Sequence, residues 1–180
     1  MSLKISTPFT VISGGQTGAD VAGLAAAHKL GIPTTGWAPK GFKTEKGPKK
    51  ILQSRYGLIE DESRDYGPRT VKNAHAADIT FIFSPQKKSS GTVKTINACI
   101  KSGCAYVVYT ECNEATTRSI LNYLMLMKPM VVNIAGNRES KCRGLSKQVV
   151  GCLTPALNSY LNDVTRNGIT PVYRHAKNND

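Results

Sequence analysis

The chain has 180 residues, of which 40% are hydrophobic, and it carries a formal net charge of +12. This length predicts a single domain with a hydrophobic core of its own. No apolar run approaches the roughly 20 residues that a membrane-spanning helix needs, and no signal-peptide pattern is present. We therefore expect a soluble, cytoplasmic protein that makes no membrane contacts.

The basic residues occur in small clusters, at 40–50, 87–88, 138–143 and 166–177. Their field attracts anions, although a basic surface can also serve solubility alone. Nucleic acid is not the expected partner, because aromatic residues make up only 7% of the chain and no common nucleic-acid-binding motif is present. A small phosphorylated ligand fits the glycine-rich loop at 11–20 better.

Five cysteines occur without a C-x-x-C pair, which argues against a disulfide framework or a structural zinc site. Cys142 is the best candidate for a reactive thiol, because it lies in the basic loop 138–143.

Apolar runs alternate with helical periodicities along the chain. In chain order the pattern predicts strand 9–12, helix 19–30, strand 32–37, helix 68–77, strand 79–83, helix 91–102, strand 105–109, helix 116–127, strand 130–135 and helix 144–161. This alternation predicts an α/β fold with a mostly parallel sheet of about five or more strands, covered on both faces. Ligands in such sheets bind at the carboxyl ends of the strands.

Two details refine this prediction. Val93, Ile96 and Ile100 form an apolar stripe on the helix 91–102, at the spacing of a helix face. The segment 38–64 is the longest irregular stretch, and a stretch of this length is usually functional or partly mobile. We expect residues 1–161 to form one domain and residues 162–180 a polar C-terminal extension.

A glycine-rich turn joins the first strand to the first helix, in the sequence VISGGQTGAD at 11–20. The first N–H groups of a helix lack partners within it, and the helix dipole is positive there, so this turn is a candidate anion site. Its spacing fits neither the dinucleotide fingerprint nor a Walker A loop. A tight turn that binds nothing is the alternative. The candidate ligand-binding residues of this turn are Gly14, Gly15, Gln16, Thr17, Gly18 and Asp20.

Three further stretches at the same sheet edge are candidates. Ser89, Ser90, Gly91 and Thr92 open a helix, where they can bind phosphate oxygens or cap the helix alone.

Arg138 and Glu139 are candidate ligand-binding residues; Arg138 can pair with a phosphate or with a carboxylate such as that of Glu139. Trp37 can stack on a planar ring beside the charge of Lys40, or it can be a core aromatic. Arg69 and Asn73, one helical turn apart, can reach a ligand or a neighbouring subunit.

Catalytic groups are scarce. None of the three histidines lies near a serine or cysteine in a nucleophile pattern, and no metal-binding motif occurs. We expect no catalytic residue and no metal site.

Taken in order, eight motifs resemble the molybdenum cofactor carrier proteins, over about 11–161. They are SGGQTGAD at 13–20, GWAPKG at 36–41, EKGP at 45–48, YGLIE at 56–60, Tyr66 with Arg69, Thr70 and Asn73, Asp78, Gly91 with Thr92, and NIAGNRES at 133–140. The resemblance implies a Rossmann-like three-layer sandwich, similar to the lysine-decarboxylase-like (LOG) phosphoribohydrolases. It also implies a homo-oligomer, a dimer or tetramer, that binds the pterin cofactor through its phosphate.

The chain departs from that family at several positions. Val21 stands where an arginine is common, Ala38 replaces a cysteine, Ser90 replaces a glycine and Asn97 a glutamate. Thr95 occupies the spacing at which the related hydrolases have a glutamate, which argues against hydrolysis of an N-glycosidic bond.

Three functions follow in order of preference. The first is a non-enzymatic carrier of a phosphorylated heterocycle, with molybdenum cofactor (molybdopterin) as the leading ligand. The second is a binder or sensor of a nucleotide-derived signal, and the third is a nucleotide phosphoribohydrolase.

Overall fold

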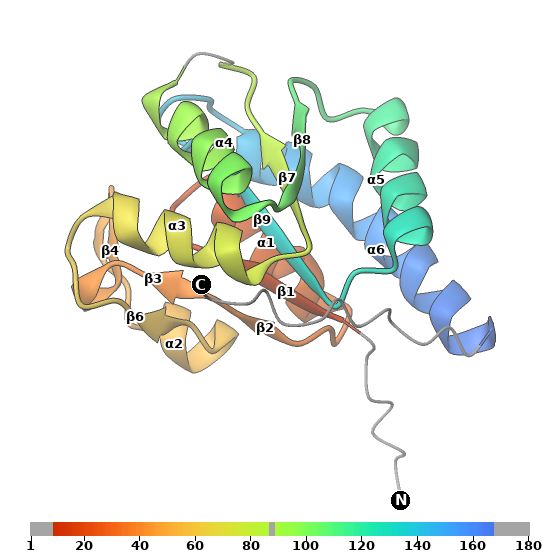
Figure 1. The fold of residues 1–180 in the computed structure, drawn as a ribbon, viewed down its shortest axis with the longest axis horizontal. Coiled ribbons are helices and arrows are strands. Elements are labelled where there is room, and N and C mark those ends of the chain that lie inside the picture. The colour runs from red at the N-terminus through yellow and green to blue at the C-terminus, as the bar shows by residue number, and fades with distance from the viewer. Residues whose placement is uncertain (1–8, 87–88, 168–180) are drawn as a thin grey trace, which may run out of the picture.

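The computed structural model describes residues 9–86 and 89–167 (Figure 1). The lysine pair 87–88 and the part of the expected C-terminal extension from 168 to 180 lie outside the described residues. Within the described ranges, no helix has the length and apolar character needed to cross a bilayer.

One five-stranded sheet organises the domain, in the order β2-β1-β9-β7-β8. Its neighbouring strands are all parallel. The strands are β1 (Thr10–Ser13), β2 (Thr34–Thr35), β7 (Ile79–Phe83), β8 (Ala105–Tyr109) and β9 (Val131–Gly136). Every residue of β7 is buried, as a strand covered on both faces requires.

Helices cover both faces of this sheet (Figure 1). On one face, α1 (Ala19–Lys29), α5 (Glu114–Met127) and α6 (Leu145–Asn167) share the largest hydrophobic cluster with the strands. On the other face, α3 (Tyr66–Ala76) and α4 (Ser90–Ser102) pack through a smaller cluster. The predicted Rossmann-like three-layer α/β fold is confirmed.

The orientation of α4 corrects the expected stripe. Val93 is 46% exposed and Ile100 is 61% exposed, whereas Ile96 is half-buried, so two of the three side chains of this stripe point outward. The buried face of α4 consists of Thr92, Thr95, Ala98 and Cys99. These smaller side chains face the interior, and Val93 and Ile100 of the apolar stripe lie on the surface.

The expected irregular segment 38–64 contains more structure than its composition indicates. It holds a 3-10 turn (Lys40–Phe42), a short hairpin of β4 (Lys43–Thr44) with β5 (Gly47–Pro48), and α2 (Ile51–Tyr56). The pair β3 (Trp37–Ala38) and β6 (Ile59–Glu60) forms a separate two-stranded sheet. This unit has its own apolar cluster around Phe42 and Leu58.

Two boundaries also differ from the expectation. The apolar run 32–37 splits into β2 and β3, which belong to different sheets, with Gly36 between them. The last helix continues from Leu161 to Asn167, because Val164 still packs on the core.

The sheet register brings three loops together. Ser13 of β1 pairs with Ile134 of β9, and Phe83 of β7 pairs with Gly136 of β9. The loops that follow β1, β7 and β9 therefore start at the same sheet edge. Along the chain, β2 is added on one side of this point and β8 on the other, so it is where the strand order reverses and where ligands bind in such folds.

Candidate functional site

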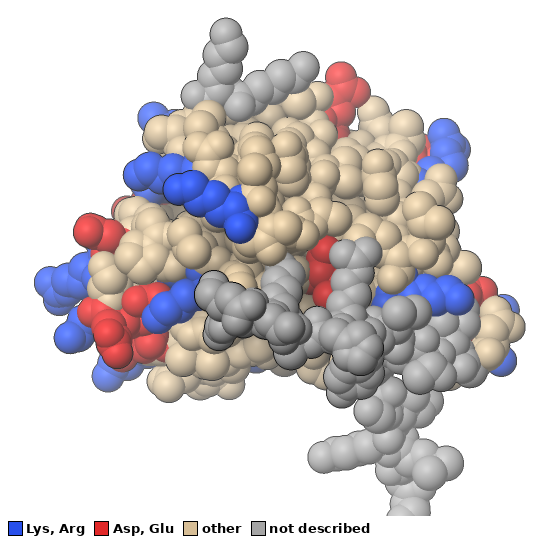
Figure 2. Space-filling view, viewed as in Figure 1, with Lys and Arg blue, Asp and Glu red and all other residues tan. Residues whose placement is uncertain are grey.

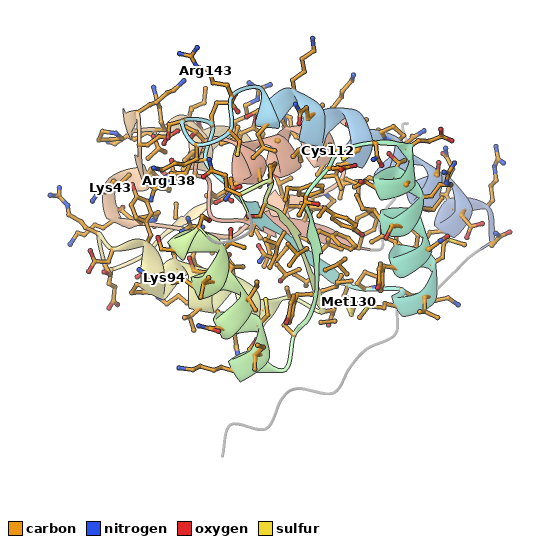
Figure 3. The ribbon with its side chains drawn as sticks, turned by 90° about the horizontal axis from the view of Figure 1, so that it is seen from above. Lys43, Lys94, Cys112, Met130, Arg138 and Arg143 are labelled. Atoms are coloured by element: carbon orange, nitrogen blue, oxygen red, sulfur yellow. The ribbon has the colours of Figure 1, made fainter. Side chains whose placement is uncertain are left out.

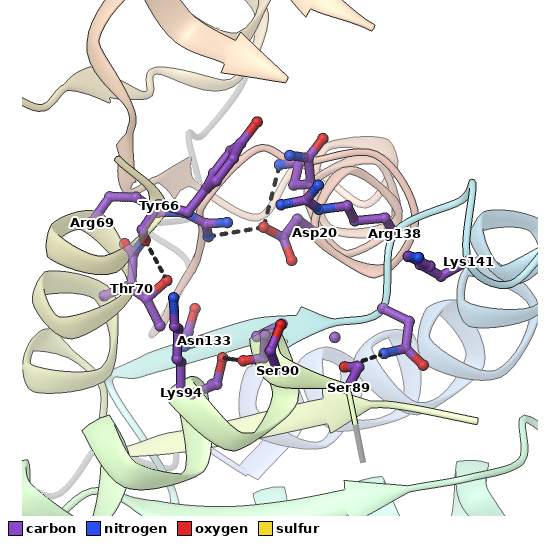
Figure 4. A pocket seen from close by; sticks show the side chains of 17 residues that line it. Asp20, Tyr66, Arg69, Thr70, Ser89, Ser90, Lys94, Asn133, Arg138 and Lys141 are labelled. Atoms are coloured by element: carbon purple, nitrogen blue, oxygen red, sulfur yellow. Dashed lines mark hydrogen bonds and ion pairs between the residues drawn. The ribbon is translucent and has the colours of Figure 1, made fainter. Parts of the chain in front are cut away.

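A cleft of about 220 Å³ opens where these three loops meet α3 and α4 (Figure 4). Gln16 and Asp20 line it from the β1–α1 side, and the first turns of α3 and α4 line it from the opposite side of the sheet. The lining residues are Gln16, Asp20, Tyr66, Arg69, Thr70, Asn73, Ser89, Ser90, Gly91, Lys94, Thr95, Asn133, Ala135, Gly136, Asn137, Arg138 and Lys141.

Basic side chains dominate the lining. The lining contains four basic side chains, those of Arg69, Lys94, Arg138 and Lys141, and one carboxylate, that of Asp20. Seen from above, Lys94 and Arg138 lie toward the same end of the molecule (Figure 3). The cleft therefore has a net positive charge, which favours an anionic ligand.

Asp20 is the buried acidic group of the cleft, with 3% of its surface exposed. Its Oδ2 accepts hydrogen bonds from the Gln16 backbone N–H at 3.2 Å and from Arg69 Nη1 at 3.0 Å. Burial raises the pKa of this carboxyl group above its ordinary value, although the charge of Arg69 and the Gln16 N–H act against that rise.

Two buried donors on residues that line the cleft have no hydrogen-bond partner among the described residues: Gln16 Nε2 and Arg69 Nε. A buried polar group without a partner is costly, and native proteins satisfy most such groups. Both atoms are donors, so an acceptor on a ligand would satisfy them.

The N-terminus of α4 forms the opposite wall. Ser89 caps this helix by accepting from the Thr92 N–H at 3.2 Å, and Asn137 Nδ2 donates to Ser89 Oγ at 2.9 Å. The cap is thus held by the loop after β9. Ser90 and Gly91, which begin the helix, line the cleft, where the positive end of the dipole favours anions.

Tyr66 is the aromatic side chain of the cleft. The Arg138 guanidinium lies 4.6 Å from its ring centroid, Lys43 Nζ 5.4 Å and the Arg69 guanidinium 5.8 Å. These cation–π contacts tie the loop after β9 to the start of α3. Among the described residues, no group of three or more His, Cys, Asp or Glu side chains could hold a metal ion.

Comparison with known proteins identifies the family. The model of the circularly permutated YpsA SLOG family matches residues 11–157. The chain belongs to this family. None of the curated protein sequences matches it significantly.

This SLOG protein is also similar to a solved structure. It is the crystal structure of a "Putative molybdenum carrier protein" from Syntrophus aciditrophicus SB, with 30% sequence identity and a TM-score of 0.75. The match covers 84% of this chain and 96% of that chain. The family indicated by the eight motifs is thus confirmed, and a binding or carrier role is supported at the level of the family.

Six of the predicted site residues line the cleft: Gln16, Asp20, Ser89, Ser90, Gly91 and Arg138. The others lie elsewhere, and a ligand role for them stays a prediction.

The predicted glycines of the first turn contact protein atoms and do not line the cleft. A Cβ on Gly14 would meet the Arg69 guanidinium, and one on Gly15 would meet Leu58. Gly18 has a φ of +85°, and a Cβ there would lie 2.3 Å from the Asn137 carbonyl oxygen. The loop after β9 therefore packs against the turn, and the Ala19 N–H donates to that same oxygen at 3.2 Å.

Four other predicted residues serve neighbouring structure. The Thr17 hydroxyl donates to Glu45 of the β4–β5 hairpin, and Thr92 Oγ1 is hydrogen-bonded to Ser84 and Ser89. Glu139 accepts from the N–H groups of Gly144 and Ser146 at the start of α6, at 2.5 and 3.0 Å. The Lys40 N–H donates to the Ser63 carbonyl oxygen.

Trp37 lies outside the cleft lining, in β3. Its backbone N–H and carbonyl are held by the Asn73 side chain, each at 3.0 Å. Tyr66, and not Trp37, is the aromatic residue that lines the cleft.

Eleven further residues line the cleft, and of these the sequence indicated only Arg69 and Asn73 as residues that can reach a ligand. The eleven are Tyr66, Arg69, Thr70, Asn73, Lys94, Thr95, Asn133, Ala135, Gly136, Asn137 and Lys141. The helical spacing of Arg69 and Asn73 was a usable signal, as was the i, i+4 spacing of Ser90 and Lys94. For Asn133 and Asn137, a polar residue in or directly after an apolar strand is the signal.

Proposed function

We propose that this protein binds a phosphorylated heterocycle in the cleft and does not transform it, with molybdenum cofactor as the leading ligand. The observation that carries the proposal is the pair of buried donors, Gln16 Nε2 and Arg69 Nε, in a cleft with net positive charge. Donors of this kind require acceptors, and a phosphate ester supplies several.

The residues of the cleft fit such a group. The Ser90 and Gly91 N–H groups at the start of α4, with Lys94 and Lys141, would hold the phosphate. Arg138 would neutralise charge beside the Tyr66 ring. Bound cofactor would supply its molybdenum–pterin chemistry to a recipient enzyme, and this chain would hold and shield it. The relative described as a molybdenum carrier supports this ligand.

A nucleotide-derived signal is the second candidate, because the same donors and cations suit a nucleotide phosphate. Hydrolysis of a nucleotide is third. Thr95, at the spacing of the hydrolase glutamate, lines the cleft, and its hydroxyl donates to the Gly91 carbonyl oxygen at 3.1 Å. A threonine held in this way is a poor general base, which favours binding over hydrolysis.

Thermal unfolding against a ligand panel tests the proposal: molybdenum cofactor, molybdate, tungstate, AMP, ADP-ribose and cyclic dinucleotides. A ligand at about 100 times its Kd adds about 2.7 kcal/mol. We expect the cofactor to raise the Tm of the wild type and of Lys101→Met, and to raise that of Lys94→Met much less. Both lysines lie on α4, but only Lys94 lines the cleft. Stabilisation by nucleotides alone would replace the carrier function by the signal-binding one.

We also propose that the protein is a cytoplasmic homo-oligomer, in which a second copy covers α4 and β8. Val93, Ile100 and Tyr106 are exposed there, β8 is an edge strand, and few charged side chains lie over β8 in Figure 2. Two copies with charges of +12 approach each other best through a face of low charge. Light scattering should give at least a dimer for the wild type and a monomer for Ile100→Lys; equal masses would reject this interface.

A further inference from the structure

One oxygen of the Asp20 carboxylate, Oδ1, accepts no hydrogen bond from the described residues. Oδ2 accepts both of the hydrogen bonds that reach this carboxylate from the described residues, from the Gln16 N–H and from Arg69. The other oxygen, Oδ1, points into the cleft (Figure 4). Hydrogen bonds within the protein thus occupy Oδ2, and Oδ1 remains available to a ligand.

The two walls of the cleft favour different chemical groups on a ligand. The α4 wall, with Ser90, Gly91 and Lys94, offers positive charge and N–H donors. The α1 wall presents Asp20. Arg69 at 3.0 Å offsets the charge of Asp20, but Oδ1 is a hydrogen-bond acceptor, and an oxyanion without a proton has no hydrogen atom to donate to it. An anionic group therefore belongs at the α4 wall, and the part of the ligand that faces Asp20 needs a hydrogen atom to donate.

A second acceptor lies in the same cleft. Asn133 is 2% exposed, and its Nδ2 donates to Thr80 Oγ1 at 3.2 Å. This bond fixes the amide so that Oδ1, the acceptor, is the atom available to the cleft. The free donor Gln16 Nε2 completes a mixed set of groups, which suits the edge of a polar ring or a sugar better than a bare ion.

We infer that Asp20 is a specificity residue, which selects ligands that carry an N–H or O–H donor together with their phosphate and excludes bare oxyanions such as phosphate and molybdate. The inference rests on the proposed function and narrows its ligand class. Two sources can supply the donor: the exocyclic amino group of a 2-amino-4-oxo ring, as in guanine and pterins, or a sugar hydroxyl. Both give a charge-assisted hydrogen bond to Asp20.

Matched ligand pairs identify the donor in the wild-type chain. GMP and IMP differ by the exocyclic amino group, and GMP and 2′-deoxy-GMP differ by one hydroxyl. A hydrogen bond to a charged group corresponds to about a tenfold or larger change in Kd. We expect at least one pair to differ by about tenfold in calorimetric titration, and GMP to bind at least tenfold more tightly than inorganic phosphate or molybdate.

The substitution Asp20→Asn keeps the shape of the side chain and removes its charge. It should reduce the difference within the responsive pair to about twofold or less, because a neutral amide is the weaker acceptor. Asp61→Asn is the matched control: Asp61 is also buried and ion-paired, with Lys72 at 3.1 Å, but lies outside the cleft lining. It should keep the wild-type difference.

The outcomes separate this inference from the function on which it rests. If GMP, IMP, 2′-deoxy-GMP and inorganic phosphate bind equally well, Asp20 is no specificity residue, while anion binding in the cleft stands. A tenfold difference that survives in Asp20→Asn also overturns the inference. If no phosphorylated compound binds the wild type, the proposed function fails and the inference fails with it.

Discussion

The Arg69 guanidinium lies directly against the backbone of Gly14. A Cβ at position 14 would come within 1.5 Å of Arg69 Nη1, and the same Nη1 lies 3.0 Å from Asp20 Oδ2. The glycine thus gives the arginine room to reach its partner. The first turn of the chain uses this glycine for an ion pair between α1 and α3.

Replacement of either residue should therefore break the same ion pair. Arg69→Met leaves the Asp20 carboxylate buried without its cation, which we expect to cost about 3 kcal/mol of unfolding free energy. Gly14→Ala should cost a similar amount, because the new methyl group displaces the guanidinium. The two effects should be far from additive in the double variant, as for residues that share one interaction.

Urea unfolding measures these free energies. Arg118→Met is the control, because it removes an exposed ion pair with Glu114 and should cost under about 1 kcal/mol. Additive losses at positions 14 and 69 would show that the glycine does not serve the ion pair.

A comparison of two glycines, Gly18 and Gly41, tests the contact between the first turn and the loop after β9. Gly18 and Gly41 both have positive φ, +85° and +74°, but only a Cβ on Gly18 would meet neighbouring backbone atoms. Gly41→Ala should cost about 1–2 kcal/mol, the strain of a left-handed residue. Gly18→Ala should cost clearly more and should weaken ligand binding, because it displaces the loop that carries Arg138. Equal losses would exclude this role of the contact.

The pH dependence of stability should reflect Glu139. Hydrogen bonds from the Ser146 N–H, the Ser146 hydroxyl and the Gly144 N–H lower the pKa of this carboxyl group below its ordinary value of 4.5, although burial opposes the change. The native state then holds this proton less tightly than the unfolded state does. The stabilisation is present above pH 4.5 and is lost as the pH falls through the lowered native pKa.

Denaturant unfolding between pH 6 and 3 should therefore show a smaller loss of stability in Glu139→Gln than in the wild type. Ser146→Ala, which removes one donor, should give an intermediate slope. Parallel curves for all three proteins would mean that Glu139 does not stabilise the start of α6.

Thiol labelling should single out Cys112. Cys112 and Cys142 are partly exposed, whereas the other cysteines are buried. A hydrogen bond with Cys152 lowers the pKa of the Cys112 thiol, despite its partial burial, so more of it is thiolate. Cys112→Ser should remove the fastest phase of reaction with a maleimide, and Cys142→Ser should leave it. The reverse result would identify Cys142, the candidate from sequence alone, as the more reactive thiol.

Local patterns were enough to predict the layered fold. The run from Ile79 to Phe83, apolar except for Thr80, identified a strand covered on both faces, and alternation with helices predicted the parallel sheet. The orientation of α4 was not predictable in this way, because Val93 and Ile100 have the spacing of a core face yet lie on the surface. Hydrophobic periodicity identifies a face but does not say whether the sheet or another partner covers it.

The site was predicted in part for a similar reason. Residues of the loops and helix starts that follow a strand, such as Gln16, Ser90 and Arg138, were found because the carboxyl ends of parallel strands lie at one edge. Tyr66 and Arg69 come from α3, which packs beside that edge from a distant part of the chain. The spacing of Arg69 and Asn73 indicated a shared helix face, but the packing of that face beside the sheet edge depends on tertiary contacts that spacing does not encode.

The central claim is that the cleft beside Arg138 binds a phosphorylated heterocycle, and calorimetric titration with molybdenum cofactor tests it most directly. The account predicts saturable binding to the wild type and to Arg143→Met, which changes a basic residue outside the cleft lining. It predicts at least about tenfold weaker binding to Arg138→Met, the loss of one charge-assisted contact. Binding of equal strength in both variants, or no binding to the wild type, would contradict it.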